Sequence, residues 1–138
     1  MARILCLDYG LKRVGVAVTD ELQIIASPLE TIHTAEIISF INSYIKENKV
    51  ELFVVGLPFN LRGEETDATK KTLSFISLLK RKYPLIKVDT YDERFTSKIA
   101  KDTILMMGKN KKFRQDKTNI DKLSASIILQ SYLKRKGL

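Results

Sequence analysis

Residues 3–18 read RILCLDYGLKRVGVAV, two short apolar runs separated by a turn that contains glycine. The turn spans 10–13, and the second run, 14–18, is rich in β-branched valine. Such runs bounded by turn residues predict a β-hairpin. A third run follows at 24–32, and Pro28 within it favours a strand at the edge of a sheet, where the missing N–H costs no ladder hydrogen bond. We therefore expect three consecutive strands, joined by hairpins, at the start of the chain.

The remainder of the chain alternates between helical and strand patterns. Apolar residues at helical spacing predict helices that begin near Thr34, Thr66 and Ser97, and a final helix capped by Asn119. The second of these helices is expected to present Leu73, Ile76 and Leu79 to the core. Apolar runs at 52–56 and 86–91 predict two further strands, the first of them buried on both faces.

The order of elements, βββαβαβα, determines the expected architecture. Hairpin-linked strands followed by right-handed crossovers form a mixed five-stranded sheet with helices on both faces. This α/β arrangement is the ribonuclease H-like fold, in which the first strand is central and the fourth and fifth strands run parallel to it. A chain of 138 residues fits one such domain, and we expect 1–138 to form it.

Composition excludes several classes of protein. Hydrophobic residues make up 44% of the chain and charged residues 29%, which argues against a disordered or collagen-like protein. The single cysteine, Cys6, cannot form an internal disulfide, and the single histidine, His33, leaves no zinc site to build. No apolar run approaches membrane-spanning length, and the charge at Asp8 comes too early for a signal peptide. We expect a cytoplasmic protein with no membrane association.

The positive charge is concentrated in the second half of the chain. The net charge is +8, but residues 1–79 carry a net of −2 and residues 80–138 a net of +10. Such an asymmetry favours a polyanionic partner, and nucleic acid is the first candidate. A well-solvated, lysine-rich surface is the alternative interpretation.

Three carboxylates end strands or open helices next to apolar runs. Asp8 closes the first strand, Glu93 follows the fifth, and Asp121 lies in the expected first turn of the final helix. Each alone is a common feature, a turn-forming aspartate or an acid that complements a helix dipole. In the expected fold the two strand-end acids lie at the same end of the sheet. The final helix, which carries small residues beside its acid, can bring the third carboxylate against them.

Carboxylates gathered in this way repel one another unless cations lie between them. Mg²⁺ or Mn²⁺ prefers oxygen ligands and keeps water positions open for a substrate phosphate. Two such ions can activate a water and stabilise the leaving oxygen of a phosphodiester. Asp8, Glu93 and Asp121 are therefore the candidate catalytic residues and metal ligands of a two-metal-ion nuclease.

Basic residues near these acids and in the segment 109–117 are candidates for contact with nucleic acid. That segment has no apolar period and is interpreted as a loop, in which an aromatic ring among cations could stack on a base. The candidate contacts are Lys12, Arg13, Arg94, Lys109, Lys111, Lys112, Phe113 and Arg114. A solvated hairpin tip at 12–13 and a solvated connector at 109–117 are the alternatives.

Four motifs resemble the YqgF family, also called RuvX-like, in order and with matching spacing along essentially the whole chain. They are Asp8-Tyr9-Gly10 with 13–17, Val55-Gly56-Leu57-Pro58 with Asn60 and Gly63, Asp92-Glu93-Arg94, and Asp121 through Ala125 to 128–130. Two departures are visible. Phe95 stands where leucine is usual after the Glu-Arg pair, and Ser124 stands where the first of two alanines is usual. Neither departure alters the three acids.

The resemblance implies a ribonuclease H-fold nuclease of the bacterial cytoplasm. The family was first labelled as Holliday junction resolvases by similarity to RuvC. It is now associated with 5′-end processing of the 16S ribosomal RNA precursor during ribosome biogenesis. Asp8, Glu93 and Asp121 fall on the family's acidic catalytic positions.

Four functions follow from these observations. The first is a metal-dependent hydrolase of phosphodiester bonds in structured RNA, pre-16S rRNA above all. The second is a Holliday junction resolvase acting on branched DNA, which would use the same acids and would need a homodimer rather than a monomer. The third is a non-catalytic nucleic-acid-binding module. The fourth is an actin-like ATPase, since Asp8-Tyr9-Gly10 also resembles its phosphate-binding turn, although such proteins bind nucleotide between two domains.

Overall fold

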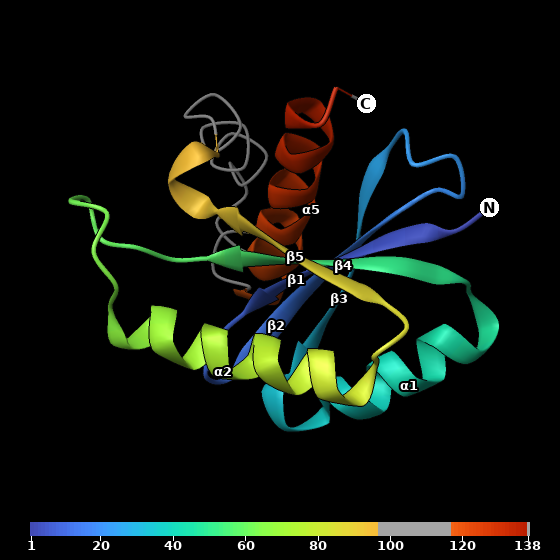
Figure 1. Cartoon of the computed structure of the whole chain (residues 1–138), viewed down its shortest axis with the longest axis horizontal. Coiled ribbons are helices and arrows are strands. Elements are labelled where there is room, and N and C mark those ends of the chain that lie inside the picture. Colours follow the sequence, from blue (N-terminus) through green and yellow to red (C-terminus); the bar gives the residue numbers. More distant parts are fainter. Residues whose placement is uncertain (97–116, 138) are drawn as a thin grey trace.

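The structure, a computed structural model, describes residues 1–96 and 117–137. Five strands form one mixed sheet in the order β3-β2-β1-β4-β5 (Figure 1). The strands are β1 (Arg3–Tyr9), β2 (Arg13–Thr19), β3 (Ala26–His33), β4 (Val50–Leu57) and β5 (Lys87–Asp92). β2 runs antiparallel to both β1 and β3, whereas β1, β4 and β5 are parallel to one another. The predicted hairpins, the central first strand and the parallel pairs are confirmed.

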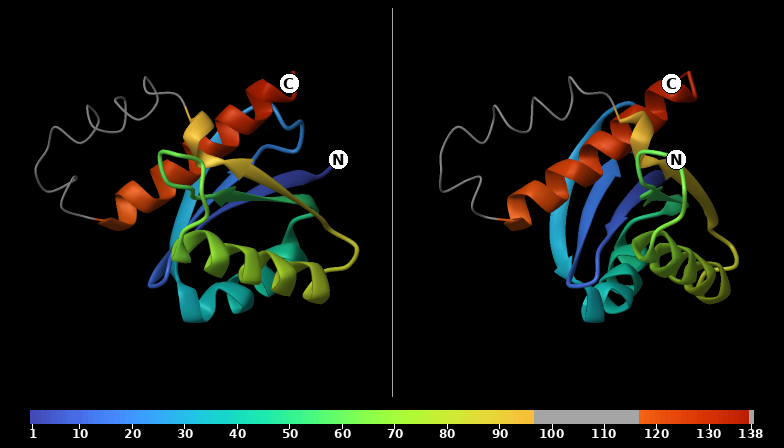
Figure 2. Two further views of the ribbon diagram at one scale, coloured as in Figure 1. Left: turned by 60° about the vertical axis from the view of Figure 1, so that its left-hand side comes forward. Right: turned by 90° about the vertical axis from the view of Figure 1, so that its left-hand side faces the viewer.

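Helices cover both faces of the sheet. They are η1 (Thr34–Glu36), α1 (Ile37–Glu47), α2 (Asp67–Lys82), η2 (Glu93–Phe95) and α5 (Lys117–Arg135). α1 and α2 lie together on one face, and α5 crosses the other face from β2 toward β5 (Figures 1 and 2). Within residues 1–96 and 117–137, no helix is both long and apolar enough to cross a membrane.

The edge position of β3 follows from Pro28. Val16 of β2 pairs with Glu30, but the next residue, Ala17, pairs with Pro28, so Leu29 is an extra residue in β3. This bulge lies on an outer strand, where a residue without a backbone N–H is tolerated. The prediction of an edge strand at this proline is confirmed.

Alternate residues of the central strands supply two separate cores. Leu5 and Leu7 of β1 are buried with α1 and α2, whereas Ile4 and Cys6 are buried with α5. β4 divides its side chains in the same way, as its continuous apolar run predicts.

The buried face of α2 differs from the prediction. Ile76 and Leu79 are buried as expected, but Leu73 is 37% exposed. Thr69, Thr72 and Phe75 are buried instead, so the centre of the buried face lies on the side of the helix axis away from Leu73. Hydrophobicity alone placed Leu73 on that face, whereas the register of α2 leaves it at the margin.

The start of α5 also corrects the sequence analysis. The helix begins at Lys117, so Asn119 lies inside it and is not its cap, and Asp121 lies in its second turn. Once a helix is nucleated, each further residue adds a backbone hydrogen bond, so polar residues such as Lys117 extend it without an apolar pattern. The helix predicted over 97–107 lies outside the described residues, as does the loop predicted over 109–117 apart from Lys117.

Thr66 is expected to contribute measurably to stability through a capping box at the start of α2. Its hydroxyl accepts a hydrogen bond from the Thr69 N–H at 3.3 Å, and the Thr69 hydroxyl accepts one from the Thr66 N–H at 3.0 Å. Thr66→Ala should lower the free energy of unfolding by about 1 kcal/mol in a urea titration. Thr66→Ser, which keeps the hydroxyl, should lose much less, and equal losses for both variants would contradict this role.

Candidate active site

Asp8 and Glu93 meet at one end of the sheet. Asp8 lies near the end of β1, on the same side as Cys6, whose side chain is buried against the α5 face. Glu93 is the first residue after β5 and opens η2, which the Thr96 hydroxyl closes by donating to the Glu93 carbonyl at 2.6 Å. Because β1, β4 and β5 are parallel, their carboxyl ends lie at the same edge. The two side chains share a hydrogen bond across this edge.

Gly56 makes room for this pair on the strand between them. A Cβ atom at Gly56 of β4 would lie 2.8 Å from Oε1 of Glu93 and 2.9 Å from Cδ1 of Ile128. The carboxyl group of Glu93 and the side chain of Ile128 therefore occupy the space above Gly56. The glycine allows Glu93 to point over the sheet toward Asp8.

Asp121 reaches the same region because α5 rests on β2 at Gly15. Gly15 pairs with Asp8 across the β1–β2 ladder. A Cβ atom at Gly15 would overlap the backbone carbonyl of Asp121, with the carbonyl carbon 2.5 Å away. Small residues of α5 were expected to allow a close helix approach, and Ala125 is indeed buried. Gly15 was not among the predicted residues, although a glycine inside a valine-rich strand is a known signal for close approach of another backbone.

The electrostatics of Asp8 reflect this crowding. Burial raises the pKa of the Asp8 carboxyl well above its usual range, and the Glu93 charge, the hydrogen bond with Glu93 and the Asp121 charge raise it further. Burial also raises the pKa of the Cys6 thiol, and the charges of Asp8 and Glu93 add to that shift. The site thus holds more negative charge than its surroundings stabilise.

Asp121 has a second partner, Arg13 of β2. The Nε atom of Arg13 lies 2.7 Å from Oδ2 of Asp121, and the two side chains are 33% and 29% exposed. Arg13, a candidate for nucleic-acid contact, therefore lies at the border of the acid pair. Within residues 1–96 and 117–137, no group of three or more His, Cys, Asp and Glu side chains is assembled to hold a metal. The structure brings Asp8 and Glu93 into contact and places Asp121 beside them in an ion pair.

Arg94 lies on the outer side of Glu93. Its guanidinium donates three hydrogen bonds to the Asp92 carboxylate, including one from Nη2 to Oδ2 at 2.6 Å, and lies 5.4 Å from the centre of the Phe59 ring. A pocket of about 390 Å³, which Pro58 and Leu61 also line, opens between this arginine and the loop after β4. Because Glu93 lines it as well, the loop after β4 opens on the same rim as Asp8, as predicted.

Of the other candidates for nucleic-acid contact, the structure describes only Lys12. Lys12 is exposed in the turn between β1 and β2, where its backbone carbonyl accepts a hydrogen bond from the Thr34 N–H at 3.0 Å. The remaining candidates lie outside the described residues: Lys109, Lys111, Lys112, Phe113 and Arg114.

The raised pKa of Asp8 predicts a pH-dependent stability of the metal-free protein. A carboxyl with a higher pKa in the folded state stabilises the fold fully below its unfolded pKa, and this contribution is lost as pH rises through the folded pKa. Asp8→Asn removes the titrating group. The difference in unfolding free energy between Asp8→Asn and the wild type should therefore increase from pH 4 to pH 8, measured by urea unfolding in chelator. The same pH dependence of the unfolding free energy in Asp8→Asn and the wild type would contradict this prediction.

The fold and the acid pair at the end of the central strand define a ribonuclease H-like α/β protein. Two solved structures share this fold. Thermus thermophilus RuvC, in complex with a Holliday junction substrate, matches with a TM-score of 0.63 and 16% identity over 99% of this chain and 97% of that chain. The yeast mitochondrial Holliday junction resolvase Ydc2 matches with a TM-score of 0.55 and 11% identity over 99% of this chain and 79% of that chain.

The chain belongs to the RuvX family. A family model described as "RuvX: Holliday junction resolvase" matches residues 2–135. Proteins named "Putative pre-16S rRNA nuclease" are similar over the whole chain. The one from Amoebophilus asiaticus is 48% identical over 96% of this chain and 94% of its own length. The one from Bacteroides fragilis is 46% identical over 100% of both chains. The resemblance found in the sequence motifs is confirmed.

Proposed function

We propose that this chain is a nuclease that hydrolyses phosphodiester bonds in the 5′-end processing of pre-16S rRNA. The observation that carries the proposal is the hydrogen-bonded pair of Asp8 and Glu93 at the end of the central sheet, with Asp121 beside it. The names of the relatives that match over the full length support the RNA substrate. The domain 1–138 would carry the whole activity, in the bacterial cytoplasm.

The donor set fits a divalent cation. Asp8, Glu93 and Asp121 offer only carboxylate oxygens, the ligands that Mg²⁺ and Mn²⁺ prefer. Burial and, after it, the nearby charges of Glu93 and Asp121 raise the pKa of Asp8, and a bound cation would favour the ionised form against both effects. These three residues would hold the metal, which supplies activation of a water and neutralisation of the leaving oxygen.

The residues of the chain itself have separate tasks in this proposal. The raised pKa of Asp8 favours its protonated form in the metal-free site, whereas only an ionised carboxylate would serve as a metal ligand. Arg13 holds Asp121 against β2 and keeps its carboxylate at the border of the site. Arg94, anchored on Asp92, presents its guanidinium next to Glu93, where it can meet a substrate phosphate.

Further basic residues, outside the acid site, would bind the RNA backbone. Lys12 on the turn before β2 is exposed at the same end of the sheet as Asp8. The segment 109–117, with its four basic candidates and Phe113, would add contacts that depend on salt. The protein would act on RNA as a monomer or a homodimer.

Cleavage assays on two substrates test this function. A 5′-extended 16S precursor fragment and a synthetic four-way DNA junction are incubated side by side with Mg²⁺ or Mn²⁺. We expect wild-type protein to cleave the RNA, and chelator to stop the cleavage. Cleavage of the junction alone would instead support a Holliday junction resolvase. Binding of either substrate without cleavage, under both metals, would support the non-catalytic module.

A further inference from the structure

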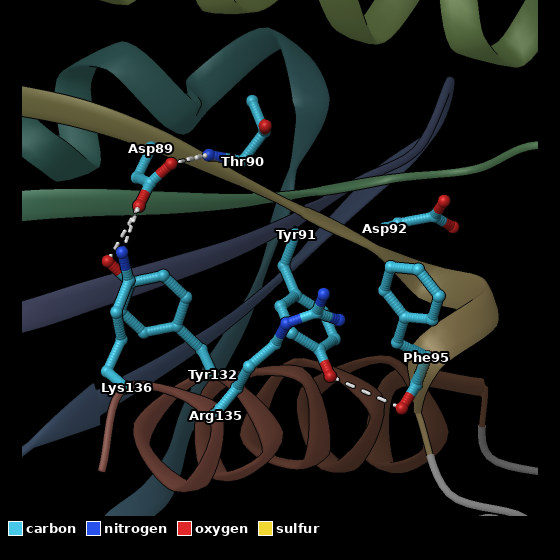
Figure 3. A pocket seen from close by; sticks show the side chains of 8 residues that line it. All are labelled: Asp89, Thr90, Tyr91, Asp92, Phe95, Tyr132, Arg135 and Lys136. Carbon is cyan, nitrogen blue, oxygen red and sulfur yellow. Dashed lines mark hydrogen bonds and ion pairs between the residues drawn. The ribbon is translucent and has the colours of Figure 1, made fainter. Parts of the chain in front are cut away.

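A second pocket lies beyond Glu93, between β5 and the C-terminal turns of α5 (Figure 3). Its volume is about 420 Å³. The lining side chains used below are Asp89, Tyr91, Phe95, Tyr132, Arg135 and Lys136. None of them belongs to the acid site. Phe95 and Glu93 lie in the same short helix, η2, so one lining residue of the pocket is two positions from a residue of the acid pair.

Phe95 and Arg135 provide a planar surface at the wall of the pocket. Phe95 is 51% exposed, although it is a large apolar side chain. The guanidinium of Arg135 lies 4.3 Å from the centre of its ring, and Tyr91 contacts the ring edge-to-face with centres 6.4 Å apart. The Tyr91 hydroxyl also donates a hydrogen bond to the Phe95 carbonyl at 3.2 Å. Phe95 is thus held in position while about half of the residue remains exposed, which suits a stacking platform.

The two carboxylates that line the pocket already have partners. Asp92 is bound by Arg94 at 2.6 Å. Asp89 accepts a hydrogen bond from the Tyr132 hydroxyl at 2.8 Å and lies 3.7 Å from Nζ of Lys136. Among the residues that the structure describes, Arg135 forms no ion pair. Its positive charge is therefore available to an incoming anion.

We propose that this pocket binds an unpaired nucleotide of the substrate strand, with its base against Phe95 and its phosphate against Arg135. A base offers the flat face that an aromatic ring and a guanidinium plane both accept. A phosphate offers Arg135 the direct anionic partner that it does not have among the described residues. The inference rests on the proposed function, because it requires a nucleic-acid strand that is bound at Glu93 and continues into the pocket. It specifies that function further: the substrate is single-stranded next to the cleavage site.

Equilibrium binding of a fluorescent oligouridylate, measured in chelator so that no cleavage occurs, tests the pocket. Phe95→Leu keeps an apolar side chain but removes the ring, and should lower the affinity about fivefold or more. Arg135→Ala should lower the affinity and make the slope of log K against log salt shallower by up to about 0.7. Lys134→Ala removes the same charge from an exposed neighbour that does not line the pocket, and should lose less than Arg135→Ala.

Two results would overturn the proposal. One is wild-type affinity in both Phe95→Leu and Arg135→Ala, and the other is an equal loss in Lys134→Ala and Arg135→Ala. A fully paired RNA duplex gives a further check, because its bases offer no free face. Phe95→Leu should bind the duplex as the wild type does, and an equal loss on both probes would refute stacking. Thermal unfolding of each variant confirms that it is folded.

Failure of this inference is distinguishable from failure of the proposed function. The binding assay needs neither metal nor cleavage, whereas the nuclease proposal is judged by cleavage of the precursor fragment. A wild-type protein that cleaves the precursor while Phe95→Leu and Arg135→Ala both bind oligouridylate normally would overturn the pocket alone. A protein that never cleaves, but loses oligouridylate affinity in both pocket variants, would overturn the nuclease alone.

Discussion

Asp8→Asn is expected to lower the rate of cleavage of a 16S precursor fragment by more than about 100-fold at saturating Mg²⁺. Loss of a group that only supports a ligand costs 10- to 100-fold in metal affinity or activity, and Asp8 is proposed as a ligand itself. Asparagine keeps the shape of the side chain but removes the charge that holds a cation. The affinity for RNA in chelator should stay within about twofold of the wild type, because the basic residues are unchanged.

Glu47→Gln is the matched control for this change. Glu47 is an exposed acid at the end of α1, on the face of the sheet opposite to α5. Its neutralisation alters the net charge as Asp8→Asn does, without touching the acid pair. Cleavage by Glu47→Gln should equal that of the wild type. Near wild-type cleavage by Asp8→Asn would remove Asp8 from the catalytic assignment.

Gly15→Ala is expected to destabilise the protein and to impair cleavage together. The added methyl group would overlap the backbone carbonyl of Asp121, which cannot rotate away as a side chain can. α5 must then move off β2, at a cost of about 1–3 kcal/mol in unfolding free energy. Because Asp121 moves with the helix, we expect a loss of cleavage even at temperatures where the variant is folded.

Gly56→Ala provides the comparison, since its methyl group would meet only the ends of the Glu93 and Ile128 side chains. These ends can move, so we expect a smaller loss of stability than for Gly15→Ala. The change still displaces the Glu93 carboxyl, so cleavage should fall. A Gly15→Ala variant with the urea midpoint of the wild type would contradict the close approach of α5. Urea unfolding and the cleavage assay report the two effects separately.

Much of the site could be predicted from local patterns. The ends of β1 and β5 placed Asp8 and Glu93 at one edge, because parallel strands end on the same side of a sheet. The small residues beside Asp121 in the final helix predicted that this helix brings the third acid against them. The predicted start of that helix was wrong by three residues, since Lys117, Thr118 and Asn119 carry no apolar signal.

Other features depend on residues that are distant in the sequence. Arg13 was predicted to contact phosphate, and in the structure its side chain also binds Asp121, 108 positions away in the sequence. Likewise, Phe95 was noted only as a departure from the family pattern, and Arg135 was not singled out from the sequence. Their contact at 4.3 Å appears when α5 crosses the sheet to reach β5.

The sequence by itself determined the elements, their order and the edge of the sheet that carries the acids. Periodicity, turn residues and Pro28 act over a few neighbouring residues, so these features can be predicted without knowledge of distant contacts. Only the tertiary structure decided how closely α5 approaches Gly15, which partner Arg13 takes and where the second pocket forms. Each of these depends on the packing of side chains and backbone from separate elements, and that packing is a property of the folded chain as a whole.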